Sequence, residues 1–218
     1  APAAPVRANP DGAVVVHGDV RIERPDATTL RVVQSSRKAI VDWRSFDINN
    51  GEATHFAMPG ADSVNLSRIT GGDPSAILGT LSATGKLFLV NPAGIVFGEG
   101  SRVDVAGLVA TTADIGNEAF LAGRYAFDRP STVPGATVES HGAITVAERG
   151  LAALVAPTVR NAGTIAARYG RVVVAGAETF TVDLHGDGLL AFAAGPPTGS
   201  TPVLAESTGH IAADGGWV

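Results

Sequence analysis

The sequence predicts an all-β fold, a parallel β-helix, from its composition and from a repeat. The 218 residues include 27 Gly, 13 Pro and one Met, and the apolar residues fall mostly in short runs of Val, Ile, Leu and Ala. Such runs, separated by Gly, Asn and Asp, favour short strands joined by turns. Hydrophobic residues make up 45% of the chain and charged residues 17%, so the composition is not that of a disordered polypeptide.

Two series of glycines define the repeat in the C-terminal half. They are Gly142, Gly163 and Gly209, each opening a Gly-x-Ile sequence, and Gly150, Gly170 and Gly216. The last interval of the first series is twice 23 residues, and Gly186 lies midway, so we expect a further turn there. One repeat cannot bury its own apolar side, so repeats must stack. Strands stacked about 4.8 Å apart, with one turn (a rung) per repeat, give a parallel β-helix.

The repeat leaves two other folds to consider. A β-sandwich is the main rival, because its strands also recur at short intervals of roughly 8–12 residues. Leucine-rich repeats share the period of this chain, but they require Leu at fixed positions with an Asn rung. That spacing of Leu is missing here.

The first 120 residues are less regular but also favour strands. Short β runs lie at 14–16, 20–22, 30–33 and 39–41. One short helix is expected from Pro74 to Leu81. Asp73 would cap this helix, Pro74 would occupy its first position, and Gly79 would limit its length.

Two C-terminal segments complete the expected organisation. Residues 195–202 are rich in Gly and Pro, and we interpret them as a loop between rungs because the repeat resumes after them. Residues 212–218 resemble the opening of another rung. Because an open β-helix end exposes unpaired backbone, we expect the native chain to continue.

Composition also disfavours several classes of function. The net charge is −5 without a basic cluster, which disfavours binding to nucleic acid or anionic membranes. No apolar run approaches the roughly 20 residues of a membrane span, so no membrane insertion is expected. Cysteine is absent and the five histidines are scattered, without the spacing of a metal site. We therefore expect no enzyme, no metal and no cofactor, since no catalytic motif is present either.

A set of motifs lies between residues 31 and 115. In chain order they are Trp43-x-x-Phe46-x-Ile48, Asn65-Leu66-Ser67-Arg68, Gly79, Asn91-Pro92-Ala93-Gly94-Ile95 and Gly98. Together they strongly resemble the N-terminal two-partner-secretion (TPS) domain of filamentous-haemagglutinin-like exoproteins of Gram-negative bacteria. The chain is most similar to the branch with high-molecular-weight adhesins and haem–haemopexin-binding proteins. The family has Asn-Pro-Asn-Gly-Ile where this chain has Ala93.

The resemblance refines the expected fold. It implies a single TPS domain over 1–218 that forms a right-handed, single-stranded β-helix with an N-terminal cap and extra-helical antiparallel hairpins or a sheet. The expected segments are about 1–33 for the cap, 34–120 for motif-bearing rungs with the hairpins, and 121–218 for regular rungs. We expect the domain to be a monomer.

The resemblance also implies a function. The domain would target a large adhesin-like exoprotein for secretion through an Omp85-type outer-membrane transporter with periplasmic POTRA domains, and nucleate β-helix folding outside. The protein would be secreted or held at the cell surface after crossing the periplasm, and its full-length form could contact a receptor. The residues expected to carry transporter recognition are Asn65, Arg68, Asn91, Pro92, Gly94 and Ile95. The alternative is a surface module that itself binds a host glycan or neighbouring cells.

Structural interpretations accompany these assignments. The sequence at 91–94 favours a type I or II turn with Pro92 in its second position, and a turn is compatible with transporter contact. Trp43, Phe46 and Phe56 could stack on carbohydrate, but we favour a place in the core. Trp43 and Phe46, together with Gly79 and Gly98, are expected to be structural members of the motif.

Overall fold

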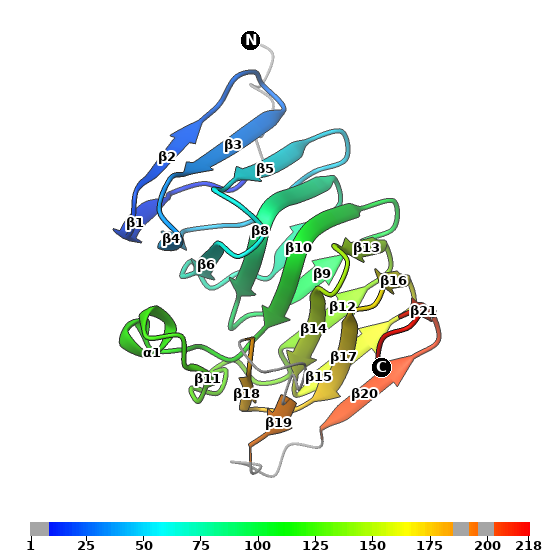
Figure 1. Cartoon of the computed structure of the whole chain (residues 1–218). Helices are drawn as coiled ribbons and strands as arrows, with labels where there is room; N and C mark the ends of the chain where they lie inside the picture. Colours follow the sequence, from blue (N-terminus) through cyan, green and yellow to red (C-terminus); the bar gives the residue numbers. More distant parts are fainter. Residues whose placement is uncertain (1–8, 185–191, 196–202) are drawn as a thin grey trace.

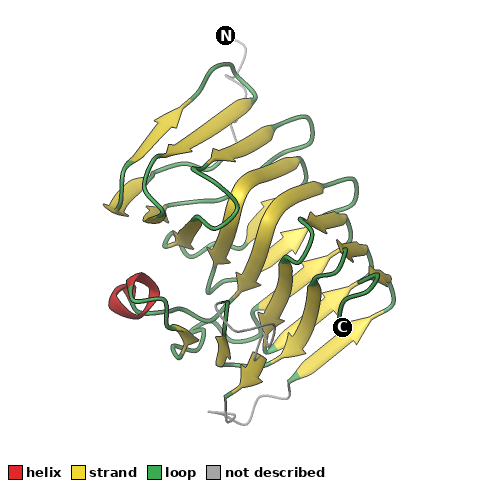
Figure 2. Cartoon of the chain, in the orientation of Figure 1, coloured by secondary structure: helices red, strands yellow, loops and turns green. Residues whose placement is uncertain are grey.

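The computed structural model describes residues 9–184, 192–195 and 203–218. These residues form a right-handed β-helix of about six turns, coiled around one apolar interior (Figures 1 and 2). Most neighbouring strands pair in parallel, which confirms the predicted β-helix and excludes two facing antiparallel sheets. A complete rung crosses three faces of the coil, A, B and C, in that order along the chain.

Each face is a ladder of stacked strands. Face A comprises β2 (Val20–Glu23), β3 (Thr29–Gln34), β5 (Ala53–Ala57), the first part of β8 (Thr80–Val90), the first part of β10 (Arg102–Thr111), β13 (Ala143–Val146), β16 (Thr164–Ala167) and β21 (His210–Ala212). Face B comprises β1 (Val14–His17), β4 (Lys38–Trp43), β6 (Val64–Ile69), the remainder of β8 and β10, β14 (Leu151–Ala156) and β17 (Arg171–Gly176). Face C comprises β7 (Ser75–Ile77), β9 (Ile95–Phe97), β12 (Thr137–Ser140), β15 (Thr158–Asn161) and β20 (Leu204–Ser207).

The first glycine series marks the corner where face C turns into face A. A Cβ on Gly163 would lie 2.2 Å from the backbone oxygen of Gly142, and one on Gly209 would lie 2.1 Å from that of Gly163. Only glycine permits this approach. Because β16 pairs directly with β21, the 46-residue interval is one turn with an insertion. The expected rung at Gly186 is therefore wrong; Gly186 itself lies outside the described residues.

An antiparallel cap covers the first rung. β1 runs antiparallel to β4, and β2 runs antiparallel to β3. Figure 1 shows these strands at one end of the coil and β20 and β21 at the other. The N-terminal cap predicted from the resemblance is thus present.

An outer layer lies against face B. It consists of α1 (Asn117–Leu121), β11 (Tyr125–Phe127), β18 (Phe180–Val182) and β19 (Phe192–Ala194), and its three strands form an antiparallel sheet. These elements come from insertions between β10 and β12 and between β17 and β20 (Figure 1). They interrupt the segment after 121, where regular rungs are expected. None of the helices in the described ranges is long and apolar enough to span a membrane.

Two apolar clusters result from this arrangement. One fills the interior of the coil with stacked residues such as Ile144 and Ile165. The other lies between face B and the outer layer, where Phe88 contacts three aromatic rings at centroid distances of 5.0–5.9 Å: Phe120, Tyr125 and Phe127. Face B is therefore apolar on both sides, which explains the near-continuous burial of β14.

The helix expected from Pro74 to Leu81 is wrong. Ser75 and Ile77 are buried while Ala76 is exposed, which is the alternation of a strand, and β7 pairs with β9. The Asp47 carboxylate accepts a hydrogen bond from the backbone N–H of Ala76 at 2.8 Å. Stacking on neighbouring rungs thus overrides the local helix-start signals. Of the loop expected at 195–202, residues 196–202 lie outside the described residues.

Candidate functional site

The turn at 91–94 is built around the side chain of Asn91. The backbone N–H of Gly94 donates to the Asn91 carbonyl at 3.0 Å, and Gly94 has φ = 121°. The Asn91 Oδ1 accepts the N–H of Ala93, and its Nδ2 donates to the Asp73 carbonyl and to Ser75 Oγ. Asn91 is 1% exposed. This side chain therefore joins its own turn to the preceding rung.

The flanks of the turn differ in exposure. Ile95 is fully buried in the interior of the coil, and Pro92 is partly exposed. The Pro92 carbonyl accepts a hydrogen bond from Ser131 Oγ at 2.6 Å. Within the motif, Pro92 and Ala93 are thus the residues that remain partly exposed on the folded domain.

Asn65 belongs to a buried polar network between faces A and B. Its Nδ2 donates to Gln34 Oε1, and its Oδ1 accepts from Ser67 Oγ. Ser67 Oγ in turn accepts the indole N–H of Trp43 at 3.1 Å. Asn65 and Ser67 are both fully buried. Such a network specifies the register of the neighbouring rungs, because a slipped register would leave its groups without partners.

Arg68 fastens the outer layer to the coil. Its guanidinium donates to the carboxylates of Asp42 and Asp114, to the Ile115 carbonyl and to Asn117 Oδ1, at 2.8–3.0 Å. Its side chain is 13% exposed. Arg68 therefore connects β4 and β6 of face B with the segment that leads into α1.

The remaining motif residues pack inside the fold. Trp43 and Phe46 meet edge to face at 5.6 Å and are buried in the interior of the coil with Phe56. They are therefore placed in the core rather than on a surface platform for carbohydrate. A Cβ on Gly79 would lie 2.3 Å from the Glu52 oxygen, and one on Gly98 would lie 2.4 Å from Leu78 Cδ2.

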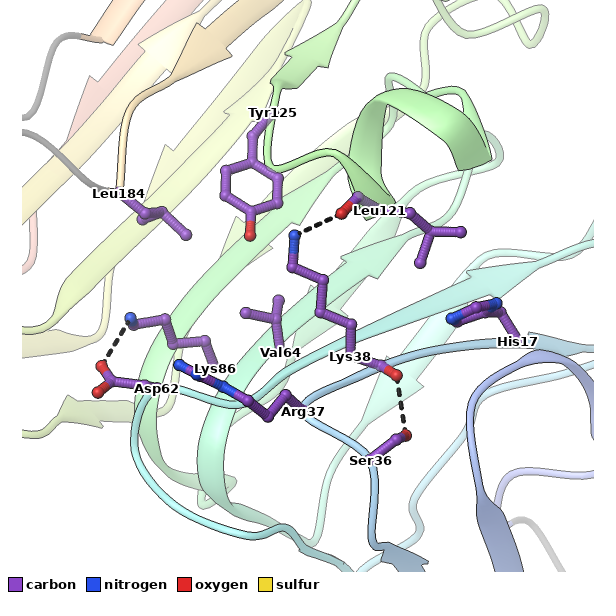
Figure 3. Close-up of a pocket in the computed structure, with 10 residues that line it drawn as sticks. All are labelled: His17, Ser36, Arg37, Lys38, Asp62, Val64, Lys86, Leu121, Tyr125 and Leu184. Carbon is purple, nitrogen blue, oxygen red and sulfur yellow. Dashed lines mark hydrogen bonds and ion pairs between the residues drawn. The ribbon is translucent and has the colours of Figure 1, made fainter.

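A pocket opens where face B meets the outer layer. Figure 3 shows its lining side chains, and its volume is about 700 Å³. Its basic side chains come from β1, β4, β8 and the turn before β4: His17, Arg37, Lys38 and Lys86. Its apolar side chains come from β6 and the outer layer: Val64, Leu121, Tyr125 and Leu184. The pocket thus has one charged wall and one apolar wall, with the small polar side chain of Ser36 and the carboxylate of Asp62 at the charged side.

Lys38 connects face B with α1 at one side of this pocket. Its ammonium donates to the carbonyls of Phe120 and Leu121 at the end of α1, and it lies 5.5 Å from the ring centroid of Tyr125. Burial, with the positive charge of Arg37 second, lowers the pKa of Lys38. Lysine at a helix C-terminus interacts favourably with the unpaired carbonyls there.

The other charged groups are more open. Lys86 lies 3.5 Å from the Asp62 carboxylate, whose side chain is 86% exposed. The side chain of Arg37 is paired with no carboxylate in the described part of the chain. The Tyr125 hydroxyl points into the space between Lys38 and Lys86 (Figure 3), and burial raises its pKa.

The sequence motifs did not indicate this pocket. Its basic residues lie at 17, 37, 38 and 86, and only the fold brings them together. The one signal in the sequence was that both lysines of the chain lie within the region that carries the motifs. Within 9–184, 192–195 and 203–218, no group of three or more His, Asp or Glu residues is placed to hold a metal ion.

Known proteins resemble the chain over most of its length. The model of the TPS secretion domain family matches residues 6–214. The heme/hemopexin-binding protein of Haemophilus influenzae is 40% identical over 114 residues, which is 52% of this chain and 12% of that protein. The same protein from a second strain of that species is 39% identical over 106 residues, 49% of this chain and 12% of that protein.

A solved structure shares the fold. The crystal structure of the HMW1 secretion domain from Haemophilus influenzae superposes with a TM-score of 0.86 at 28% sequence identity, covering 95% of this chain and 54% of that one. The resemblance inferred from the motifs is thus confirmed. TPS domains are secretion domains of exoproteins from Gram-negative bacteria, which use a two-partner-secretion transporter. The chain belongs to the TPS secretion domain family.

Proposed function

We propose that this domain directs a large adhesin-like exoprotein to an Omp85-type outer-membrane transporter through the transporter's periplasmic POTRA domains. The observation that carries the proposal is the family match over residues 6–214. The role is one of binding rather than catalysis. The protein crosses the periplasm and is then secreted or held at the cell surface, with its receptor contacts made by the full-length chain.

Burial of the motif residues supports recognition before folding. Asn65, Asn91 and Ile95 are at most 1% exposed in the folded domain. A transporter can contact these side chains only while the rungs around them are open. The same residues then close the rungs after export, and folding outside opposes return of the chain because rungs add one after another.

The edge of β1 fits a second contact that does not require an unfolded domain. Val14, Val15 and Val16 are 60%, 41% and 43% exposed. β1 pairs with β4, and its other edge pairs with no strand of the described ranges. An apolar edge strand can add to a sheet of a partner through main-chain hydrogen bonds.

Binding to isolated POTRA domains tests the proposal. The purified domain and its Val15→Lys variant are compared, with Val133→Lys as the matched control because Val133 is also exposed, at 39%, but lies outside the β1 edge. We expect capture of the wild type and of Val133→Lys, and at least about tenfold weaker capture of Val15→Lys, since a charged edge opposes strand addition.

A destabilised variant tests whether the POTRA domains recognise the domain before its rungs have closed. We expect Gly163→Val to unfold the C-terminal rungs, because a Cβ at this position would lie 2.2 Å from the Gly142 oxygen. We expect POTRA domains to retain this variant at least as well as the wild type, and retention to fall when Asn65 and Asn91 are replaced in it. Retention of the folded protein alone would contradict recognition before folding, and no retention of any form would refute the proposed function.

A further inference from the structure

The pocket between face B and the outer layer concentrates positive charge in an acidic protein. The chain has a net charge of −5 and only two lysines, yet both lysines line this pocket with Arg37 and His17. Asp62 is the one carboxylate among its lining residues. Since the sequence shows no basic cluster, the fold itself creates this local field, and a concave surface of one sign attracts the opposite charge.

Two of the cations are available to a ligand. Arg37 has no carboxylate partner within the described residues. The Lys86 ammonium lies 3.5 Å from the carboxylate of Asp62, which is largely exposed. Lys38 is held by the carbonyls of α1, but its charge still contributes to the field. Burial first, and the positive charge of Arg37 second, lower the pKa of Lys38; a bound anion would offset the second of these effects.

The second wall restricts the ligand further. Leu121 and Leu184, which are partly exposed, present aliphatic surface beside the charges (Figure 3). A saccharide needs acceptors for its hydroxyl groups, or an open aromatic face. The pocket offers one carboxylate, and its aromatic ring, Tyr125, is 1% exposed. An anionic group next to an aliphatic side chain, as in an acidic peptide, matches both walls.

We propose that this pocket binds a peptide segment in which a carboxylate side chain stands next to a leucine-like side chain. Arg37 and Lys86 hold the carboxylate, and the aliphatic side chain lies against Leu121 and Leu184. The pocket is complete only when α1 and β11 have docked on face B, so it recognises the folded domain. The proposal goes beyond recognition by the transporter and does not depend on it.

The test uses the purified folded domain without any transporter. The probe is the peptide acetyl-Leu-Glu-Leu-amide, and binding is followed by amide chemical-shift changes in NMR titrations. The same peptide with Gln in place of Glu removes the charge alone, and glucuronic acid supplies a carboxylate on a sugar. We expect saturable shifts around the pocket with the Glu peptide, and at least about tenfold weaker binding of the Gln peptide, as expected for loss of a charge-assisted contact.

Variants then locate the site. Arg37→Gln and Lys86→Met should each weaken binding of the Glu peptide about five- to tenfold. Arg102→Gln is the matched control, because it removes an exposed arginine of face A and should leave binding unchanged. Thermal unfolding followed by circular dichroism checks that each variant is folded.

Three results would overturn the proposal. They are no saturable binding of the Glu peptide, equal binding of the Gln peptide, and binding that Arg37→Gln and Lys86→Met leave intact. Glucuronic acid binding as tightly as the Glu peptide would assign the pocket to acidic saccharides instead. All these outcomes are independent of whether POTRA domains capture the protein.

Discussion

Replacing Asn91 by Ala separates the two roles that the turn motif can have. The side chain makes three hydrogen bonds, to the Asp73 carbonyl, to Ser75 Oγ and from the Ala93 N–H, while it is 1% exposed. Loss of each bond in a buried setting costs about 1 kcal/mol, and groups left without a partner add to that cost. We therefore expect Asn91→Ala to lower the free energy of unfolding by about 3 kcal/mol.

Urea unfolding followed by circular dichroism measures this loss. Against a typical domain stability of about 5–15 kcal/mol, such a loss moves the midpoint clearly without unfolding the protein in buffer. Secretion by cells that contain the transporter is measured in parallel, and we expect it to fall. A loss below about 0.5 kcal/mol together with abolished secretion would refute the reasoning, because Asn91 would then act through the transporter alone.

The other predictions concern the same turn, the glycine ladder and one histidine. Ala93→Asn, which restores the Asn of the family motif, should change stability by less than about 0.5 kcal/mol because Ala93 is partly exposed; any gain in secretion would show a transporter contact. Gly163→Ala should lower the free energy of unfolding measured in urea by at least about 2 kcal/mol, since the new Cβ would meet a backbone oxygen at 2.2 Å. Gly60→Ala, whose new Cβ meets nothing within 4 Å, should leave it unchanged. Burial first, and the positive charge of Arg31 second, lower the pKa of His55 below its usual 6.5. As the pH falls, His55 therefore takes up a proton more readily in the unfolded chain than in the folded one. Stability should therefore drop below pH 6.5, and His55→Gln should flatten that drop in unfolding curves measured between about pH 7.5 and 5.5; an unchanged slope would contradict this origin.

The regular part of the fold could be predicted because its constraints are local and repeated. A glycine is required wherever a corner approaches the preceding rung, so Gly142 and Gly163 recur with the isoleucine that follows each. Counting residues between glycines failed at 163–209, because an insertion lengthens the interval without adding a rung. Doubling the period was the wrong interpretation of a single turn that carries such an insertion.

The contacts across the outer layer could not be predicted, since no local pattern encodes them. Lys38 reaches carbonyls 82 and 83 positions away, and Arg68 reaches groups 46 to 49 positions away. The helix signals at Pro74 were stronger in the sequence than those at 117–121, where the real helix forms. There Gly116 precedes the helix without a side-chain cap, and burial of Phe120 against face B takes the place of capping.

The outer layer also links the early and late parts of the chain. β11 follows β10 in the chain, yet it pairs with β18, which is more than 50 residues further on. Phe127 stacks on Phe180 at 4.5 Å in this pairing. The middle rungs can stack as soon as they have been exported. The outer layer can cover face B completely only after β18 has been exported as well. A Phe180→Ala variant should therefore retain the coil and loosen α1 and β11, seen as faster amide exchange in the outer layer with unchanged protection of β8 and β10. Equal loss of protection in all four elements would show that coil and outer layer fold as one unit.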